Sequence, residues 1–197
     1  MSRTAKHEDT YHHGDLRKAL LDSARILLEE GGPPALSLRE IARRVGVSAP
    51  AAYHHFRNLE AIAQAVAEQG FGELSAALDN ARSGDGVNAM GMVYIGFAQA
   101  NPGLYRLMFS DGLAAKSQAG AALRAMRAQA FATLRTALEA QVPPDQARSL
   151  ALYLWSVTHG LALLAIDGQL GGAEQAQGQI AQVLEVTGRA LPPLATS

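Results

Sequence analysis

The stretch between residues 37 and 62 limits the possible folds more than any other part of this 197-residue chain. Four apolar residues recur at helical spacing and form one face of an expected helix, namely Leu38, Ile41, Ala42 and Val45. Ser37 and Glu40, three residues apart, predict a capping box at the start of that helix. Gly46 stands where the helix must end, because glycine accepts a positive φ.

A second short helix is expected directly after this turn. Ser48 is placed as its N-cap, and Pro50 falls in the first turn, where its missing N–H costs nothing. The helix continues to Phe56, and Asn58 then caps a longer third helix. Two helices joined by a glycine-containing turn form the helix-turn-helix, whose second helix enters the major groove of DNA. The stretch therefore predicts a DNA-binding motif.

An ordinary helical hairpin in a protein core would contain a similar turn, so the exposed face of the second helix is informative. Its outward positions carry Ala, Tyr and His rather than the Glu and Lys of a solvated face. Small side chains allow a close approach to base edges, and Tyr and His can donate hydrogen bonds to phosphates. The composition of this helix favours DNA binding over a purely structural hairpin.

Three segments resemble one known family. Residues 51–62 (AAYHHFRNLEAI) are similar to the DNA-binding region of the tetracycline-repressor (TetR) family. Residues 11–17 (YHHGDLR) resemble the start of one branch of that family, and residues 155–160 (WSVTHG) resemble the Trp…His-Gly signature of its C-terminal domain. The family usually has a phosphate-binding Lys where this chain has Leu59. Its loss removes one salt-dependent contact, which Arg57 could partly replace.

The resemblance implies an all-α, homodimeric transcriptional regulator, a repressor that responds to a ligand and binds a palindromic operator. It also implies roles for individual residues. Those expected at base edges are Ala49, Pro50, Ala51 and His54, with Arg39 reaching in from the preceding helix. Those expected at phosphates are Ser37, Tyr53, His55 and Arg57, and Ser48 completes the DNA-binding set.

The charge balance limits the kind of DNA binder. The net charge is −1, from 17 Lys and Arg against 18 Asp and Glu. Residues 1–62 hold 9 Lys and Arg, 8 Asp and Glu and five of the six His, so this part is mildly positive and becomes more so where His protonates. A histone-like protein that coats DNA would be strongly basic, and the sequence excludes that class.

Several other classes are also disfavoured. There is no cysteine, which excludes disulfides and thiolate metal sites. No nucleophile elbow, P-loop or zinc-protease motif occurs, so no enzyme, metal or cofactor is expected. The first 15 residues lack the apolar run of a secretory signal, and the longest apolar run, Leu161 to Ile166, is far shorter than a membrane span. We therefore expect a cytoplasmic protein.

Helical periodicity continues along the chain and no alternating strand pattern appears. Helices are expected over residues 15–30, 38–45, 51–56, 59–81, 87–100, 104–109, 116–140, 145–167 and 173–190. Residues 1–13 are expected to be a disordered arm, residues 14–60 the DNA-binding domain, and residues 61–197 a helical regulatory and dimerisation domain. The long helix from residue 59 would connect the two domains as a lever.

The helix expected over residues 145–167 is apolar on nearly all sides, so more than one face must be buried. In a chain this small, a second copy is the obvious cover. Two helices from each subunit, the last two of the chain, would then form a four-helix interface, as the resemblance also implies. A dimer presents two recognition helices to a palindromic site, whereas one short helix alone would bind too weakly.

Methionine and aromatic residues gather between residues 90 and 159, and such side chains can line an adaptable apolar pocket. The expected ligand-binding residues are Phe97, Tyr105, Met108, Phe109, Met126, Trp155 and His159. Each could instead belong to an ordinary core. His159, one helical turn after Trp155, would either place a polar group in the pocket or hold neighbouring helices together. A small apolar or amphipathic ligand there would shift the lever helix and separate the recognition helices.

Two rival interpretations stay open. One is a DNA-binding regulator that needs no small molecule, or that a protein partner controls. The other is a helical enzyme or binding module in which the helix-turn-helix is only structural. The operator, the regulated genes, the ligand and the choice between repression and activation do not follow from the sequence.

Overall fold

The computed structural model describes residues 13–84, 87–110, 118–139 and 142–189. Over these ranges the chain forms nine α-helices and one 3-10 turn, with no strand, which confirms the predicted all-α fold. The helices begin and end within a few residues of their predicted limits. The fourth helix is longer than expected and includes Ser83 and Gly84, beyond the predicted limit at residue 81. The expected N-terminal arm lies outside the described residues, apart from His13.

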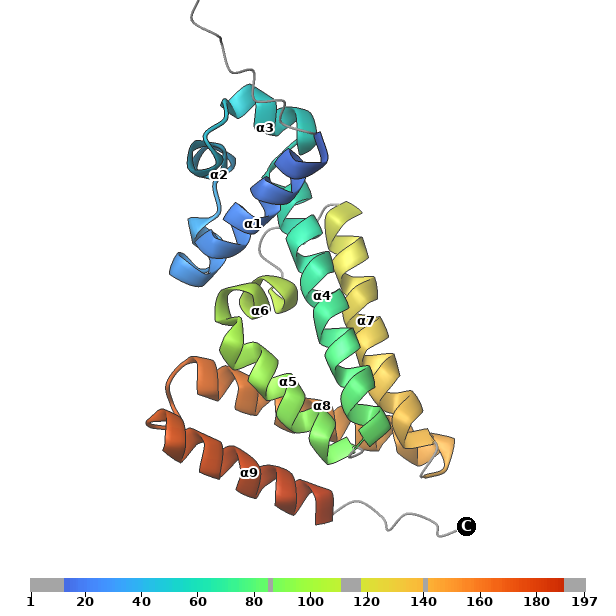
Figure 1. Cartoon of the computed structure of the whole chain (residues 1–197). Coiled ribbons are helices and arrows are strands. Elements are labelled where there is room, and N and C mark those ends of the chain that lie inside the picture. Colours follow the sequence, from blue (N-terminus) through green and yellow to red (C-terminus); the bar gives the residue numbers. More distant parts are fainter. Residues whose placement is uncertain (1–12, 85–86, 111–117, 140–141, 190–197) are drawn as a thin grey trace, which may run out of the picture.

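Three helices form the N-terminal unit at one end of the molecule (Figure 1). They are α1 (His13–Gly31), α2 (Leu38–Val45) and α3 (Ala49–His55), with the 3-10 turn Pro33–Ala35 between the first two. α1 ends as predicted, because Gly32 has a φ of 68° and two prolines follow it. Fully or almost fully buried side chains join the three helices, namely Leu20, Leu28, Ile41, Ala52 and Phe56.

α4 (Leu59–Gly84) leaves this unit as one unbroken helix and runs beside α7 (Gln118–Glu139) (Figure 1). α5 (Val87–Ala100) and α8 (Pro144–Ile166) pack against each other at the other end of α4. α9 (Ala173–Arg189) covers α5 at the far end of the molecule. One buried apolar cluster continues from α1 to α9, so α4 connects two halves that share a core.

The short helix α6 (Pro102–Phe109) lies between the N-terminal unit and the rest, and two glycines allow its close packing. A Cβ at Gly103 would lie 1.9 Å from the backbone oxygen of Leu28 in α1. A Cβ at Gly70 of α4 would lie 2.7 Å from the sulfur of Met108 in α6. The absence of these two side chains therefore lets α6 contact both α1 and α4 directly.

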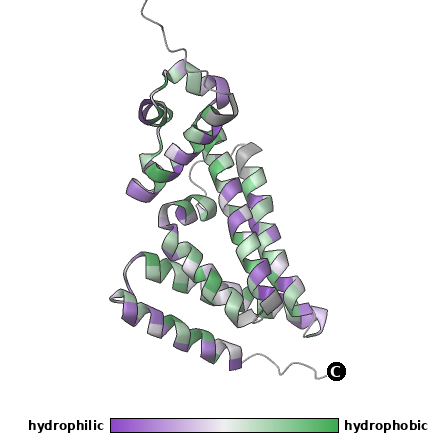
Figure 2. Ribbon diagram, viewed as in Figure 1, coloured by the Kyte–Doolittle hydropathy of each residue, from purple (hydrophilic) through white to green (hydrophobic). Residues whose placement is uncertain are grey.

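α8 departs from one expectation. By length and mean hydropathy α8 could cross a membrane, although the sequence has no uninterrupted apolar run of that length. Core helices of soluble proteins can have the same length and hydropathy. Only 22% of its apolar stretch is buried. Five large apolar side chains on α8 and α9 are exposed in the single chain, namely Leu152, Tyr153, Leu164, Val183 and Val186. Figure 2 shows hydrophobic residues along both helices.

Candidate nucleic-acid interface

The turn between α2 and α3 has the geometry that the sequence predicted. Gly46 adopts a left-handed conformation with φ 79°, and its N–H donates to the Arg43 carbonyl oxygen at 3.2 Å. The Ser48 hydroxyl accepts a hydrogen bond from the Ala51 N–H at 3.3 Å, which confirms Ser48 as the N-cap of α3. These interactions fix the direction in which α3 leaves the turn.

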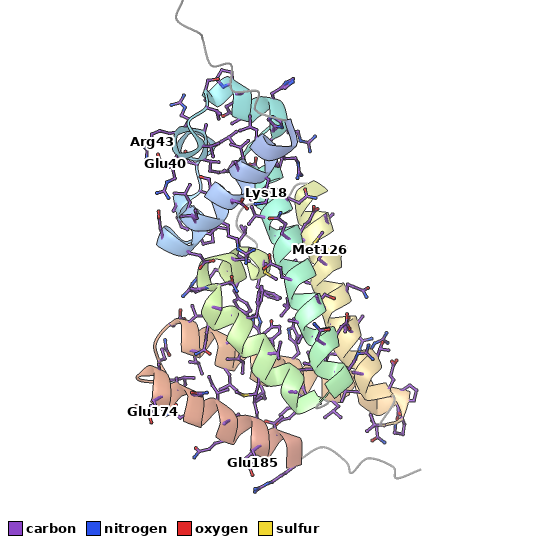
Figure 3. The ribbon with its side chains drawn as sticks, in the orientation of Figure 1. Lys18, Glu40, Arg43, Met126, Glu174 and Glu185 are labelled. Carbon is purple, nitrogen blue, oxygen red and sulfur yellow. The ribbon has the colours of Figure 1, made fainter. Side chains whose placement is uncertain are left out.

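The predicted capping box at the start of α2 is wrong. Ser37 occupies the N-cap position, but its side chain makes no capping hydrogen bond. Glu40 instead accepts two hydrogen bonds from Arg43, both 2.7 Å, and one from Arg44 at 3.0 Å. These two guanidinium groups are stronger donors than a single backbone N–H, so the carboxylate turns toward them. Figure 3 shows Glu40 and Arg43 together on α2.

This arginine pair has two consequences. The hydrogen bonds from Arg43 and then Arg44 lower the pKa of Glu40 to about 2, so it stays ionised at all ordinary pH values. Arg44 also donates to Glu30 of α1 at 2.6 and 3.0 Å, which ties α2 to α1. Arg43 keeps 72% of its side chain exposed and can still meet an anion.

Contacts from the neighbouring helices hold α3 in place. Ala52 and Phe56 are buried, and the guanidinium of Arg17 in α1 lies 5.1 Å from the centre of the Phe56 ring. This cation–π contact was missed, because nothing in the spacing of Arg17 points to α3. The Asn58 side chain accepts the Ala61 N–H at 2.9 Å, which confirms it as the cap of α4. Leu59, the departure from the family pattern, packs against the core.

The remaining face of α3 is open to solvent. The exposed members of the predicted DNA-binding set are Arg39, Ser48, Pro50, Tyr53, His54 and Arg57, and the half-buried members are Ser37, Ala49, Ala51 and His55. Tyr53 is a large aromatic side chain with 50% of its surface exposed. All ten residues lie on α2, on α3 or in the short segments that flank these helices. Their contacts with DNA stay a prediction.

Hydrogen bonds to a carboxylate of α1 hold the beginning of α6. The Glu29 carboxylate accepts the backbone N–H groups of Gly103 and Leu104 at 2.9 and 3.0 Å. A carboxylate at this position satisfies N–H groups that have no partner within the helix. No local pattern predicts this contact, because Glu29 and Gly103 are 74 residues apart.

Arg25 strengthens the same junction. Its guanidinium forms a bidentate ion pair with Glu73 of α4 and donates to the Asn101 side chain, just before α6, at 2.9 Å. The hydrogen bond to Glu73 is the main cause of a raised pKa for Arg25. Arg25 and Glu29 therefore join α1 to both helices that lead to the C-terminal half.

The other side of α6 is joined to the C-terminal helices. The Tyr105 hydroxyl lies 2.6 Å from Nδ1 of His159 in α8 and 3.0 Å from the Tyr94 hydroxyl of α5. Arg106 pairs with Asp167 at the end of α8. Arg127 of α7 donates to the backbone oxygens of Met108 and Ser110 at 2.8 and 2.5 Å. An eight-residue helix thus has polar contacts with four others, α1, α5, α7 and α8.

His159 lies among these groups as a neutral ring. Burial lowers its pKa and raises the pKa values of Tyr94 and Tyr105, so none of the three is charged near pH 7. Nδ1 of His159 lies within hydrogen-bond distance of both hydroxyl oxygens, and the Tyr105 hydroxyl donates to the Tyr94 hydroxyl oxygen. The rings of Trp155 and His159 are parallel within 8°, with centres 6.2 Å apart.

Two family models match this chain. The first, described as bacterial regulatory proteins of the tetR family, matches residues 20–66. The second, described as the C-terminal domain of tetracyclin repressor-like proteins, matches residues 87–187. The chain belongs to the TetR family. Members of this family are transcriptional regulators and not enzymes, so the helix-turn-helix is part of a DNA-binding domain. The specific Trp…His-Gly branch stays a prediction.

Individual proteins are also similar to this chain. An HTH-type transcriptional regulator of Mycobacterium tuberculosis is 27% identical over 157 residues, which cover 77% of this chain and 71% of that protein. A solved structure from Rhodococcus sp. RHA1 is 34% identical, with a TM-score of 0.73 over 94% of this chain and 100% of that one. The multidrug binding protein EbrR, crystallised with imidazole, shares the fold at 22% identity, with a TM-score of 0.59 over 91% and 97% of the two chains.

In this TetR-family fold the predicted ligand-binding residues separate into several environments. Tyr105, Phe109, Trp155 and His159 form one aromatic cluster, which Tyr94 completes. Trp155 also lines a small cavity of about 40 Å³ between α4, α5, α7, α8 and α9. Met126 instead lines a groove of about 230 Å³ between α4 and α7.

Two of the predicted ligand-binding residues are positioned as core. Tyr105 and Met108 are fully buried, and Phe97 packs against the main core with part of its surface exposed. The ligand-binding role of the whole set stays a prediction. Within the described ranges no three His, Asp or Glu side chains gather as a metal site would require.

Proposed function

We propose that this TetR-family chain is a cytoplasmic, homodimeric repressor that binds an inverted-repeat operator and releases it when a small ligand binds. The observation that carries the proposal is the solvent-exposed face of α3. Ser48 caps this helix, and the contact between Arg17 and Phe56 helps to hold it in place. A helix presented in this way can enter a major groove without any rearrangement of the unit that holds it. We also propose residues 14–60 as the DNA-binding domain and residues 61–197 as the regulatory and dimerisation domain.

The exposed apolar surface of α8 and α9 supports dimerisation through these two helices. Tyr153 and Leu164 lie eleven residues apart on α8, about three turns, so they share one face. Gly160 lies between them, and an added Cβ there would meet no atom within 4 Å. A second copy of α8 can approach closely at such a position. Apolar side chains exposed in one chain would become buried in a four-helix interface.

We expect Val186→Glu to convert the dimer into monomers, because Val186 is 65% exposed on α9 and each dimer would bury two unpaired carboxylates. Sedimentation at micromolar concentration measures the change. The control is Gln177→Glu, since nine residues place it about 180° around the same helix. A dimer that persists in Val186→Glu would remove α9 from the proposed interface.

The links of α6 support regulation from the C-terminal half. Tyr105 of α6 contacts His159, and Glu29 of α1 caps the start of the same short helix. A ligand that moved α8 relative to α5 would therefore act on α1 through α6, and on the recognition helices through α4. The ligand-bound state of EbrR makes a small organic ligand a natural expectation here as well.

A regulator without small-molecule control is the second candidate. The cavity beside Trp155 measures only about 40 Å³, room for little more than a few water molecules, so it would have to widen for a ligand. That observation favours direct control by protein level or by a partner. Duplex binding that no small molecule changes would support this second candidate.

The experiment that tests the proposed function is selection of bound duplexes from a random pool at low and moderate salt. We expect recovery of one inverted-repeat motif, with half-sites one helical turn or a multiple of it apart. The affinity should fall steeply with salt, because phosphate contacts release counterions. Recovery of no motif by the folded dimer would contradict the proposal.

A further inference from the structure

The groove between α4 and α7 has a distinct chemistry. Its walls are mainly apolar and include Phe71, Leu74, Leu78 and Met126, while Glu68 lies at one end. The other polar residues that line the groove are neutral, namely Ser75, Gln129 and Thr133. Among the described residues that line it, Glu68 is the one charged side chain. Figure 3 shows Met126 on α7 where this helix runs beside α4. An apolar trough with a single carboxylate at its end is complementary to an amphipathic molecule.

The charge of the Glu68 side chain determines which ligand head groups the groove can attract. The Glu68 carboxylate accepts a hydrogen bond from the Gln64 side-chain amide at 2.7 Å, a neutral donor. The Glu68 side chain is exposed, and its carboxylate has no ion-pair partner among the described residues. A ligand anion would be repelled, a neutral donor would gain only a hydrogen bond, and a cation would also gain the attraction of opposite charges.

The groove adjoins the cavity beside Trp155. Leu78 and Ala130 line both the groove and the cavity beside Trp155, so these two side chains form the partition between the two spaces. The inner cavity is lined by neutral residues, among them Tyr94 and Thr158. A charged group could not be placed there without a large desolvation cost. The orientation of a bound molecule follows: the apolar end faces Trp155 and the charged end stays at Glu68.

We propose that this groove binds an amphipathic organic cation, with its positive group at Glu68 and its apolar part along α4 toward Trp155. The inference rests on the ligand-responsive part of the proposed function and names the ligand class. Glu68 and Leu78 are ten residues apart on one helix, about 15 Å by helix rise, which matches an alkyl chain of roughly ten to twelve carbons. Such a molecule lies between α4 and α7 and pushes on the helix that carries the DNA-binding unit.

The test compares decyltrimethylammonium, decanoate and decanol, which share one tail and differ in the charge of the head. The full-length dimer is titrated without DNA, below the concentration at which each probe forms micelles. Calorimetry gives the affinity and the number of sites. Trp155 is the single tryptophan of the chain, so its fluorescence reports whether the tail approaches the inner cavity.

We expect decyltrimethylammonium to bind once per subunit and about tenfold more tightly than decanoate, because a partly exposed ion pair contributes modestly for the cation and opposes the anion by a similar amount. Glu68→Gln should leave the two probes equal, with the fold unchanged. Gly72→Leu should weaken both, since Gly72 lines the groove and the larger side chain would occupy part of it, while its Cβ meets no atom within 4 Å.

The inference would be overturned by equal or tighter binding of decanoate to the unaltered protein, or by a cation preference that survives Glu68→Gln. Absence of binding by any probe, with duplex binding intact, would also overturn it while leaving a DNA-binding regulator in place. Binding of the cation at Glu68 without any change in operator affinity would instead keep the site and refute the ligand-responsive part of the proposed function.

Discussion

Gly103→Ala is expected to destabilise the protein by about 3 kcal/mol, near the upper end of the range for overpacked sites. The new Cβ would lie 1.9 Å from the Leu28 carbonyl oxygen and 2.9 Å from the Glu29 nitrogen, and a backbone cannot move aside as a flexible side chain can. α6 must then separate from α1, which also breaks the two hydrogen bonds from Gly103 and Leu104 to Glu29.

Thermal unfolding measures this effect, and a fall in Tm of roughly 10 °C is expected for a chain of this size. The matched control is Gly96→Ala in α5, where the added Cβ meets no atom within 4 Å. That change should stabilise the protein slightly, by about 0.5 to 1 kcal/mol, because alanine favours a helix over glycine. Operator affinity should fall in Gly103→Ala and not in Gly96→Ala. Equal Tm values for the two variants would show that α1 and α6 are not in close contact.

Ala51→Asp is expected to weaken operator binding by about a hundredfold, since each of two subunits would place a carboxylate against DNA at a cost of about 1.4 kcal/mol. The fold should tolerate the change. Ala51 is the third residue of α3 after the Ser48 cap, and a negative charge in the first turn of a helix is mildly stabilising. Loss of binding with an unchanged Tm would therefore assign the effect to the interface.

The control for this variant is Ala173→Asp, which puts the same charge in the first turn of α9, at the other end of the molecule (Figure 1). It should bind the operator as the unaltered protein does. Titration of a labelled duplex at two salt concentrations measures both variants. If Ala51→Asp retained full affinity, α3 would not be the helix that approaches base edges.

Where the sequence predicted structure correctly, the signal was local. The turn at Gly46 and the caps Ser48 and Asn58 each depend on a few neighbouring residues, and all three are confirmed. The capping box at Ser37 failed for a related reason. Arg43 and Arg44 lie on the same helix as Glu40 and donate to its carboxylate, and Arg44 also pairs with Glu30 of α1. The spacing of Ser37 and Glu40 alone could not show that these arginines compete for Glu40.

The candidate sites beyond the helix-turn-helix depended on tertiary structure. The sequence gathered aromatic and methionine residues into one expected pocket, whereas the structure distributes them among a buried cluster, a small cavity and a groove. Glu68 was absent from the expected set, because a glutamate on a long amphipathic helix looks like any solvated residue. Its position at the end of an apolar groove arises only when α7 packs beside α4.

The sequence by itself determined that the chain is helical, that it carries a DNA-binding motif and that it resembles TetR regulators, because helical period, caps and turn residues act over a few positions. Only the tertiary structure decided how the two halves are joined. Glu29 caps α6, Arg25 bridges to Glu73, and His159 contacts two tyrosines, across separations of 48 to 75 residues. Packing of helices brings such partners together, and no local pattern records it.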